Sequence, residues 1–319
     1  MAVGNDHNGR ALDWAAAEAS VRGCGLHVVH AERLPWAVDP SGLVPVPDFE
    51  SCRAAAEKVL QAAVRRARSV SSDLEISAQL LLGPTVASLV SHGRRAQLLV
   101  LGSGRTRSPR RLRGMLTSSV VGQVATHASC PVGIVRSLEN GPHEGAPPRV
   151  VVGVDGTTSS AALEFACRAA AQRGVPLAVV HAWTPDLPAD HEAVSAPVSC
   201  SEAVARRVLD QILSRWQNGF PDIRVEPRLV CDDPAAALIR ESEGAALLVL
   251  GTRGRGSARA KLFGSVSRSV IARTRCPTVV VRPHRPVHGT STGPARQTAT
   301  PVIDVTGSEW APGWRAPWE

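Results

Sequence analysis

The chain has 319 residues and a mass of 33.6 kDa, and at roughly 150 residues per domain this length suggests two domains. Hydrophobic residues make up 44% and charged residues 20%, which excludes a wholly disordered chain. The 3% of aromatic residues, with no Tyr, argues against proteins that stack single-stranded nucleic acid on aromatic side chains. The formal net charge of +8 leaves nucleic acid, a membrane or a smaller ligand as partners to distinguish.

The sequence predicts a cytoplasmic protein without a membrane anchor. No apolar run approaches the roughly 18 residues of a transmembrane helix. The first residues, Met1–Asp6, lack the basic and apolar regions of a signal peptide. The seven cysteines are scattered and include no Cys-x-x-Cys pair, so we expect reduced thiols, with neither a disulfide framework nor a metal site.

The chain contains a duplicated domain. Residues 11–31 and 162–182 align without gaps, and 11 of the 21 positions are identical. The landmarks Gly83-Pro84, Leu98–Gly102 and Cys130–Arg136 then recur in the same order at offsets of 150, 149 and 146. The proline- and glycine-rich segment 137–149 reads as a linker. We therefore predict a first domain over residues 1–136 and a second domain over residues 150–282, and a disordered tail over residues 283–319.

The second domain is the complete copy, and strand patterns alternate with helix patterns along it. Short apolar runs predict strands at 150–154, 177–181, 223–230, 247–250 and 278–281. Helices are expected at 161–173, 201–216, 235–243 and 265–273. This alternation predicts an α/β fold in which helices cover both faces of a parallel sheet. Ligands of such sheets bind beyond the carboxyl ends of the strands, so the loops after Val154, Val180 and Leu250 are the candidate site.

The loop after the fourth strand carries the most specific motif. Its glycines and serine follow the spacing G-x2-G-x9-G-S, from Gly251 and Gly254 to Gly264-Ser265. Glycines let the backbone approach a phosphate closely, and the helix that opens at Ser265 offers free N–H groups and a partial positive charge. The loop lacks the Gly-Lys-Ser/Thr of a Walker loop, and it follows the fourth strand rather than the first, unlike a dinucleotide fingerprint. By itself, a glycine-rich loop is also compatible with a simple turn.

Several segments together resemble the universal stress protein family, in its tandem bacterial form. They are Val151–Thr157, Val179–Ala182, Leu248–Gly256, Gly264–Ser267 and Cys276–Val281, and the resemblance extends over nearly all of residues 2–282. It implies two flavodoxin-like domains of the adenine nucleotide alpha hydrolase-like type, each with a five-stranded parallel sheet, arranged as a pseudo-dimer through the strands at 132–135 and 278–281. It also implies that the protein binds ATP, with an accompanying Mg ion left open.

The resemblance also implies which residues contact the nucleotide. Asp155 would contact the ribose or adenine, although capping of the first helix is an alternative role for this residue. Val154 and Ala182 would line the adenine site. The ribose and phosphates would lie against Gly251, Gly254, Gly264, Ser265 and Val266. His181 is expected to be structural, and we assign no catalytic residue.

The first domain departs from this pattern. Only Met1–Asn8 stands where the second domain has an opening strand and turn, so Asp155 aligns with Gly4, or with Asp6 if a gap is allowed. Gly254 is matched by Arg105 and Gly264 by Ser118, and the loop is longer by three residues, since 119 − 102 = 17 and 265 − 251 = 14. We expect the first domain to bind ATP poorly or not at all.

The favoured function is an ATP-binding cytosolic regulator of stress or dormancy responses that acts through an unknown protein partner, without membrane or nucleic-acid binding. One alternative is a slow ATPase or another nucleotide-handling enzyme of the same fold. A second is a scaffold for protein interactions that binds no nucleotide. Association into a homodimer stays open.

Overall fold

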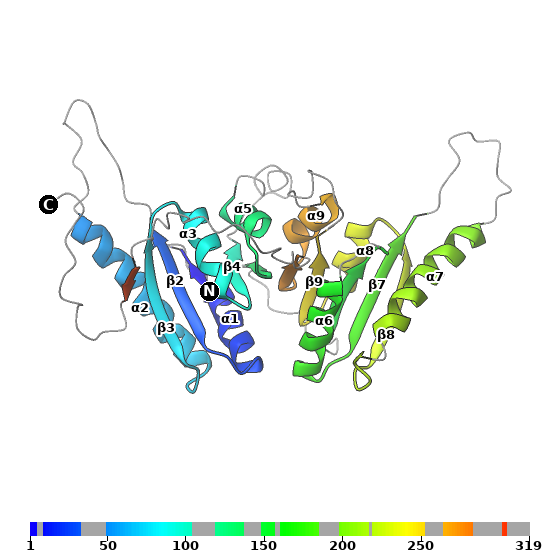
Figure 1. The fold of residues 1–319 in the computed structure, drawn as a ribbon, viewed down its shortest axis with the longest axis horizontal. Coiled ribbons are helices and arrows are strands. Elements are labelled where there is room, and N and C mark those ends of the chain that lie inside the picture. Colours follow the sequence, from blue (N-terminus) through cyan, green and yellow to red (C-terminus); the bar gives the residue numbers. More distant parts are fainter. Residues whose placement is uncertain are drawn as a thin grey trace, which may run out of the picture.

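The computed structural model contains one continuous 11-stranded sheet with helices on both faces (Figure 1). It describes residues 1–4, 9–32, 49–103, 119–136, 148–156, 160–184, 198–216, 219–252, 264–282 and 302–304. The strand order is β11-β3-β2-β1-β4-β5-β10-β9-β6-β7-β8. The two predicted domains therefore share a single sheet.

The first domain contains five parallel strands. They are β1 (Ala2–Val3), β2 (Leu26–Glu32), β3 (Ile76–Leu82), β4 (Leu99–Ser103) and β5 (Val132–Arg136). The helices are α1 (Gly9–Val21), α2 (Phe49–Val70), α3 (Thr85–His92) with the short 3-10 helix η1 (Gly93–Arg95), and α5 (Val120–His127).

The second domain repeats this arrangement. Its parallel strands are β6 (Val150–Val154), β7 (Leu177–Trp183), β8 (Val225–Cys231), β9 (Leu247–Gly251) and β10 (Thr278–Val281). Its helices are α6 (Ser160–Arg173), α7 (Val198–Trp216), α8 (Pro234–Glu241) and α9 (Ser265–Arg273). The expected fold class, with two copies of a five-stranded parallel sheet, is confirmed.

The second domain has a separate apolar core on each face of its sheet. Val150 and Val152 pack with α6 and α7, whereas Val151, between them, packs with Leu238 of α8 and Val270 of α9. Alternate residues of a strand point to opposite faces, so a strand covered on both faces must be apolar throughout. This explains the short apolar run, Val150–Val154 with Gly153 within it, from which β6 was predicted.

Antiparallel pairing between β5 and β10 joins the two sheets. Thr278 pairs with Ile134 and Val280 with Val132, which confirms the expected pseudo-dimer within one chain. The packing follows the pairing, because Ile271 of α9 and Val280 of β10 belong to the same apolar cluster as Ile134 of the first domain. In Figure 1, α5 and α9 lie side by side above this joint.

The two copies differ at their first strands. β1 consists of two residues, and Ala2 alone pairs with β4, whereas all five residues of β6 pair with β7. Beside β1 lies a cavity of about 440 Å³ that Met1, Leu26 of β2 and Leu98 help to line.

A short segment of the C-terminal region also pairs with the sheet. Val302–Asp304 (β11) runs antiparallel to β3, with Val302 opposite Leu81 and Asp304 opposite Gln79. Sequence patterns indicated disorder throughout residues 283–319, and apart from β11 and its backbone pairs this region lies outside the described residues.

Removal of core volume tests this packing. Leu248 on β9 is fully buried at 0% exposure, so we expect Leu248→Ala to lower the free energy of unfolding by about 2–5 kcal/mol in urea titrations. Val204 on α7 is 58% exposed and provides the control, since Val204→Ala should change stability by less than about 0.5 kcal/mol. Equal losses for the two variants would contradict the assignment of Leu248 to the core.

Candidate functional site

The candidate site lies where the chain of the second domain reverses its order across the sheet. From the central strand β6 the chain continues to β7 on one side, and it later returns to β9 on the other side. α6 and α7 pack on one face of the sheet, and α8 and α9 pack on the opposite face. In sheets of this kind, ligands bind beyond the carboxyl ends of the strands at the switch point.

Asp155 lies directly after β6, at the carboxyl end of this strand. Its side chain is exposed, and Gly156 follows with a φ of 75°, a left-handed conformation that favours glycine. A Cβ atom at Gly156 would lie 3.1 Å from Cγ1 of Val208, so the turn also packs closely against α7. This turn directs the chain from Asp155 towards the first residue of α6, Ser160.

The N-terminus of α9 faces the same end of the sheet. Gly264 is its N-cap residue, and Val266 packs against the apolar cluster that contains Leu250 of β9. Gly264 has no side chain to cap the helix, and the side chain of Ser265 is exposed. The first N–H groups of a helix have no partners within the helix, so this terminus can bind an anion.

The predicted site residues divide into those the structure brings together and those it does not. Asp155, Gly251, Gly264 and Ser265 lie around the switch point, with Ala182 half-buried at the end of the neighbouring strand β7. Val154 is buried among α6 and α7, whereas Val266 packs on the opposite face of the sheet. These two valines therefore do not line a common surface. Gly254 lies outside the described residues.

His181 joins the carboxyl ends of β6 and β7. Its Nδ1 lies 2.9 Å from the carbonyl oxygen of Val154, and because a carbonyl only accepts, Nδ1–H must be the donor. The first domain contains the same bond, from His30 Nδ1 to the carbonyl of Val3 at 2.8 Å. Sequence reasoning missed this bond, although the repeated Val-Val-His-Ala was its signal. Its geometry supports the structural role expected for His181.

The corresponding helix terminus of the first domain is arranged differently. Ser119 is the N-cap of α5, and its hydroxyl oxygen accepts a hydrogen bond from the Gly122 amide at 3.1 Å. One N–H group that would face an anion is thereby already bonded to the chain itself. Gly4 is exposed, while Asp6 and residues 104–118 lie outside the described residues.

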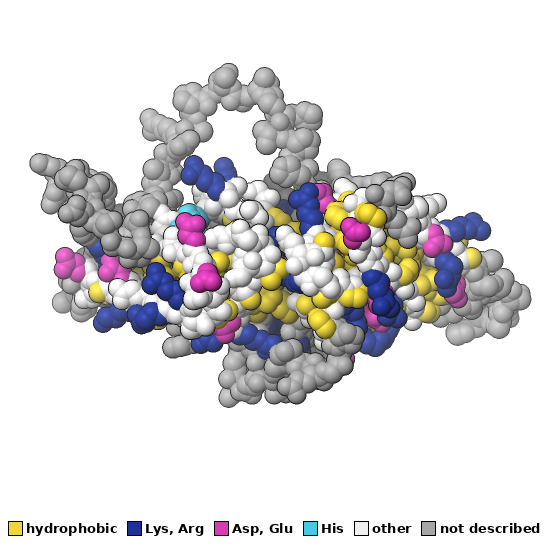
Figure 2. All heavy atoms as spheres, turned by 90° about the horizontal axis from the view of Figure 1, so that it is seen from below, with side chains coloured by type: hydrophobic (Ala, Val, Ile, Leu, Met, Phe, Trp, Pro, Cys, Tyr) yellow, Lys and Arg dark blue, Asp and Glu magenta, His cyan; other side chains and the backbone are white. Residues whose placement is uncertain are grey.

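The described residues offer no obvious metal centre or membrane anchor. They contain no group of three or more His, Cys, Asp or Glu side chains that could bind a metal ion. None of the described helices is long and apolar enough to cross a membrane. On the face seen in Figure 2, basic and acidic side chains are interspersed, without the continuous basic stripe of a nucleic-acid binder among the described residues.

Comparison with known proteins decides the family. The profile of the universal stress protein family matches residues 1–136 and 148–282. The chain belongs to the universal stress protein family. Universal stress protein Rv2005c of Mycobacterium tuberculosis is 34% identical over 279 residues, which cover 84% of this chain and 91% of the relative. Universal stress protein Rv2623 of the same organism is 32% identical over 284 residues, which cover 85% and 91%.

Solved structures of universal stress proteins share the fold. A universal stress protein from Archaeoglobus fulgidus superposes with a TM-score of 0.64 at 19% identity, covering 88% of this chain and 94% of that one. A putative universal stress protein from Pseudomonas aeruginosa gives 0.55 at 17% identity, covering 89% and 91%. These structures place two copies of the universal stress protein fold in the tandem chain.

The cysteines differ in their expected reactivity. Burial raises the pKa of the Cys167 thiol to about 11 and that of Cys276 to about 12, whereas Cys231 is exposed. The thiolate is the reactive form, so iodoacetamide at pH 8 should alkylate Cys231 and leave Cys167 and Cys276 unmodified until the protein is unfolded. Peptide mass spectrometry reads the modified positions. Rapid labelling of Cys276 in the native protein would be inconsistent with this packing.

Proposed function

We propose that this universal stress protein binds ATP at the switch point of its second domain and acts as a cytosolic regulator of stress or dormancy responses. The observation that carries the proposal is the N-terminus of α9, where Gly264 leaves the first amides of the helix without a capping side chain. This terminus lies next to the strand end at Leu250 and Gly251, within the G-x2-G-x9-G-S motif. Family membership supports the assignment.

The charges of the site suggest how ATP would be oriented. The triphosphate carries the negative charge and would lie against the positive end of α9. The carboxylate of Asp155 would repel phosphates but accept hydrogen bonds from ribose hydroxyls or the adenine amino group. ATP would therefore extend from α9 across the end of β9 towards β6. An accompanying Mg ion would be bound mainly by the phosphates, because Mg²⁺ sites of this kind use one or two carboxylates at most.

A regulatory role would require that ATP binding change the conformation of the protein. A ligand shifts a conformational equilibrium only if it binds one state better than the other. ATP occupancy would favour one arrangement of the loops around α9, and a protein partner would distinguish the two arrangements. The first domain would bind ATP weakly, since the Ser119 hydroxyl occupies an amide of its equivalent helix.

Gly264→Val tests the phosphate contact. A Cβ at Gly264 would have no atom of the described residues within 4 Å, so we expect the folded protein to accept the valine while the side chain blocks the approach of a phosphate. We expect calorimetric titration to show one ATP site in the unmodified chain and at least about tenfold weaker binding in the variant. Gly219→Val is the matched control, because a Cβ at Gly219 likewise has no described atom within 4 Å and Gly219 precedes β8, away from the site. Unchanged affinity in Gly264→Val would refute the phosphate site.

Asp155→Ala tests the opposite end of the ligand. Loss of hydrogen bonds to a charged group should weaken ATP binding about tenfold, with little change in the inorganic triphosphate affinity. Equal loss of ATP and triphosphate binding in Asp155→Ala would contradict the proposed orientation.

Two measurements on the unmodified chain separate the alternative functions. A steady-state phosphate-release assay separates a regulator, with near-zero turnover, from a slow ATPase. Mass spectrometry of gently purified protein detects bound ATP or AMP and so separates both from a nucleotide-free scaffold.

A further inference from the structure

Two helices that begin beside the proposed ATP site end against the first domain. α6 follows the turn after Asp155, and α9 begins at Ser265. The C-terminal end of each helix is hydrogen-bonded to a charged residue of the first domain, Glu18 for α6 and Arg136 for α9. The first domain is therefore in direct contact with both helices that frame the site of the second domain.

Arg136, the last residue of β5, binds the C-terminus of α9. Its Nη1 donates to the carbonyl oxygen of Ala272 at 2.6 Å and lies 3.4 Å from that of Thr274. The last carbonyls of a helix have no partners within the helix and carry its partial negative charge, so a guanidinium is well suited to this position. Ile271 and Ala272 also pack in the apolar cluster around Ile134 of the first domain. Both polar and apolar contacts thus fix this end of α9.

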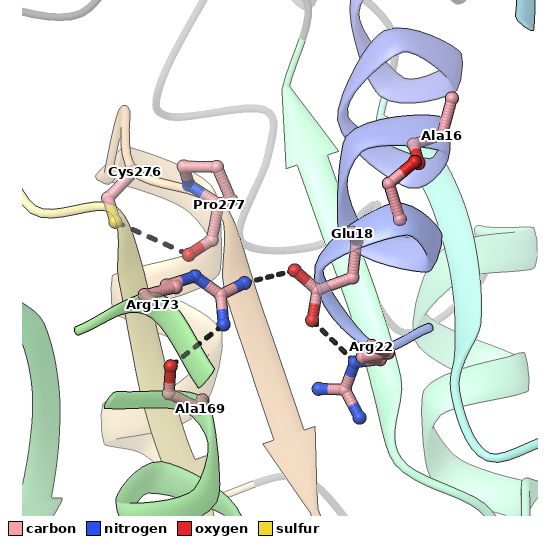
Figure 3. Close-up of polar contacts among 8 residues, drawn as sticks. Ala16, Glu18, Arg22, Ala169, Arg173, Cys276 and Pro277 are labelled. Atoms are coloured by element: carbon pink, nitrogen blue, oxygen red, sulfur yellow. Dashed lines mark hydrogen bonds and ion pairs between the residues drawn. The ribbon is translucent and has the colours of Figure 1, made fainter. Parts of the chain in front are cut away.

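Glu18 of α1 makes the second contact. Its carboxylate accepts hydrogen bonds from Arg173, the last residue of α6, and from Arg22, the residue that follows α1, at 2.6 Å (Figure 3). Arg173 also donates to the carbonyl oxygen of Ala169, in the last turn of α6, at 3.0 Å. Glu18 is 4% exposed and both arginine side chains are 12% exposed, so the network is buried between the domains. A buried carboxylate of this kind is strongly destabilising if its partners are lost.

Among the described residues, the second domain does not make the equivalent charged contacts with helices of the first domain. Arg22 and Arg173 occupy equivalent positions in the duplicated sequence, but the equivalent of Glu18 is Ala169, so one carboxylate serves both arginines. Arg282 is the equivalent of Arg136, and its buried Nε has no hydrogen-bond partner among the described residues. The charged groups of the interface therefore connect the first domain to the site helices of the second.

We propose that the first domain is a positioning module for the ATP site of the second domain, with Glu18 and Arg136 as its positioning residues. This inference rests on the proposed function. Each helix is a rigid rod with one end at the site and the other end fixed by the first domain, so a shift at the interface moves the site. Coupling between sites is reciprocal, so ATP binding must in turn stabilise the interface.

The experiment compares ATP affinity in full-length variants of the interface. We expect Arg136→Met and Glu18→Gln each to weaken ATP binding about fivefold or more, although neither residue is placed at the ligand. Arg66→Met and Asp13→Asn are matched controls, because Asp13 lies on α1 and its ion pair with Arg66, at 2.7 Å, stays within the first domain. The controls should bind ATP like the unmodified chain.

Hydrogen exchange distinguishes a positioning role of Arg136 from a purely structural one. The Thr274 amide donates to Val270 at 2.8 Å and reports on the last turn of α9. ATP should slow exchange at this turn in the unmodified chain, and Arg136→Met should abolish the ATP-dependent part of the protection. Arg136→Lys retains a donor and a positive charge, and should restore part of the ATP response.

Each outcome bears on the proposal. If the unmodified chain binds ATP and both folded interface variants bind it equally well, the positioning role is refuted while the proposed function stands. If the unmodified chain binds no ATP, both are overturned. If Arg136→Met fails to fold, Glu18→Gln decides, since it keeps the shape of the side chain and one acceptor oxygen.

Discussion

The antiparallel pairing of β5 with β10 is the constraint on which the rest of the molecule depends. The edge strand of a sheet exposes unpaired backbone N–H and C=O groups, and here β5 and β10 pair their backbone groups with each other. The pairing brings α5 and α9 together, so that Ile271 and Val280 enter the core of the first domain. It also brings α1 close to α6, where Trp14 packs against the core of the second domain. A substitution that disturbs the pairing of β5 with β10 therefore affects the packing of both domain cores.

Most of the fold could be predicted because its determinants are local. The valine run of β6 and the helix from Ser265 to Arg273 have the bounds expected from their patterns. The bounds of β8, Val225–Cys231, differ more from the predicted range 223–230. β8 lies at the edge of the sheet, where exposed positions carry polar residues and make the apolar pattern harder to recognise. The candidate site was located in the same way, from strand ends and glycine spacing, and its contacts with a ligand stay a prediction.

The interactions that sequence reasoning missed join residues far apart in the chain. Glu18 and Arg173 are 155 positions apart, and neither residue is marked by its neighbours as part of an interface. The side chain of Val154, which was expected beside the ligand, is buried among α6 and α7 on the same face as Val150 and Val152. Ser119 looked equivalent to Ser265, yet one is an N-cap and the other a first-turn residue.

The single carboxylate between Arg22 and Arg173 illustrates what covalent fusion of two copies permits. In a dimer of identical chains, every substitution near the symmetry axis is present in both subunits. A glutamate at this position would therefore bring two buried carboxylates to one interface. In a tandem chain the substitution enters once, and the position equivalent to Glu18 can remain alanine. Duplication within one polypeptide thus allows each copy to diverge, as the single Glu18 and the full G-x2-G-x9-G-S motif of the second domain illustrate.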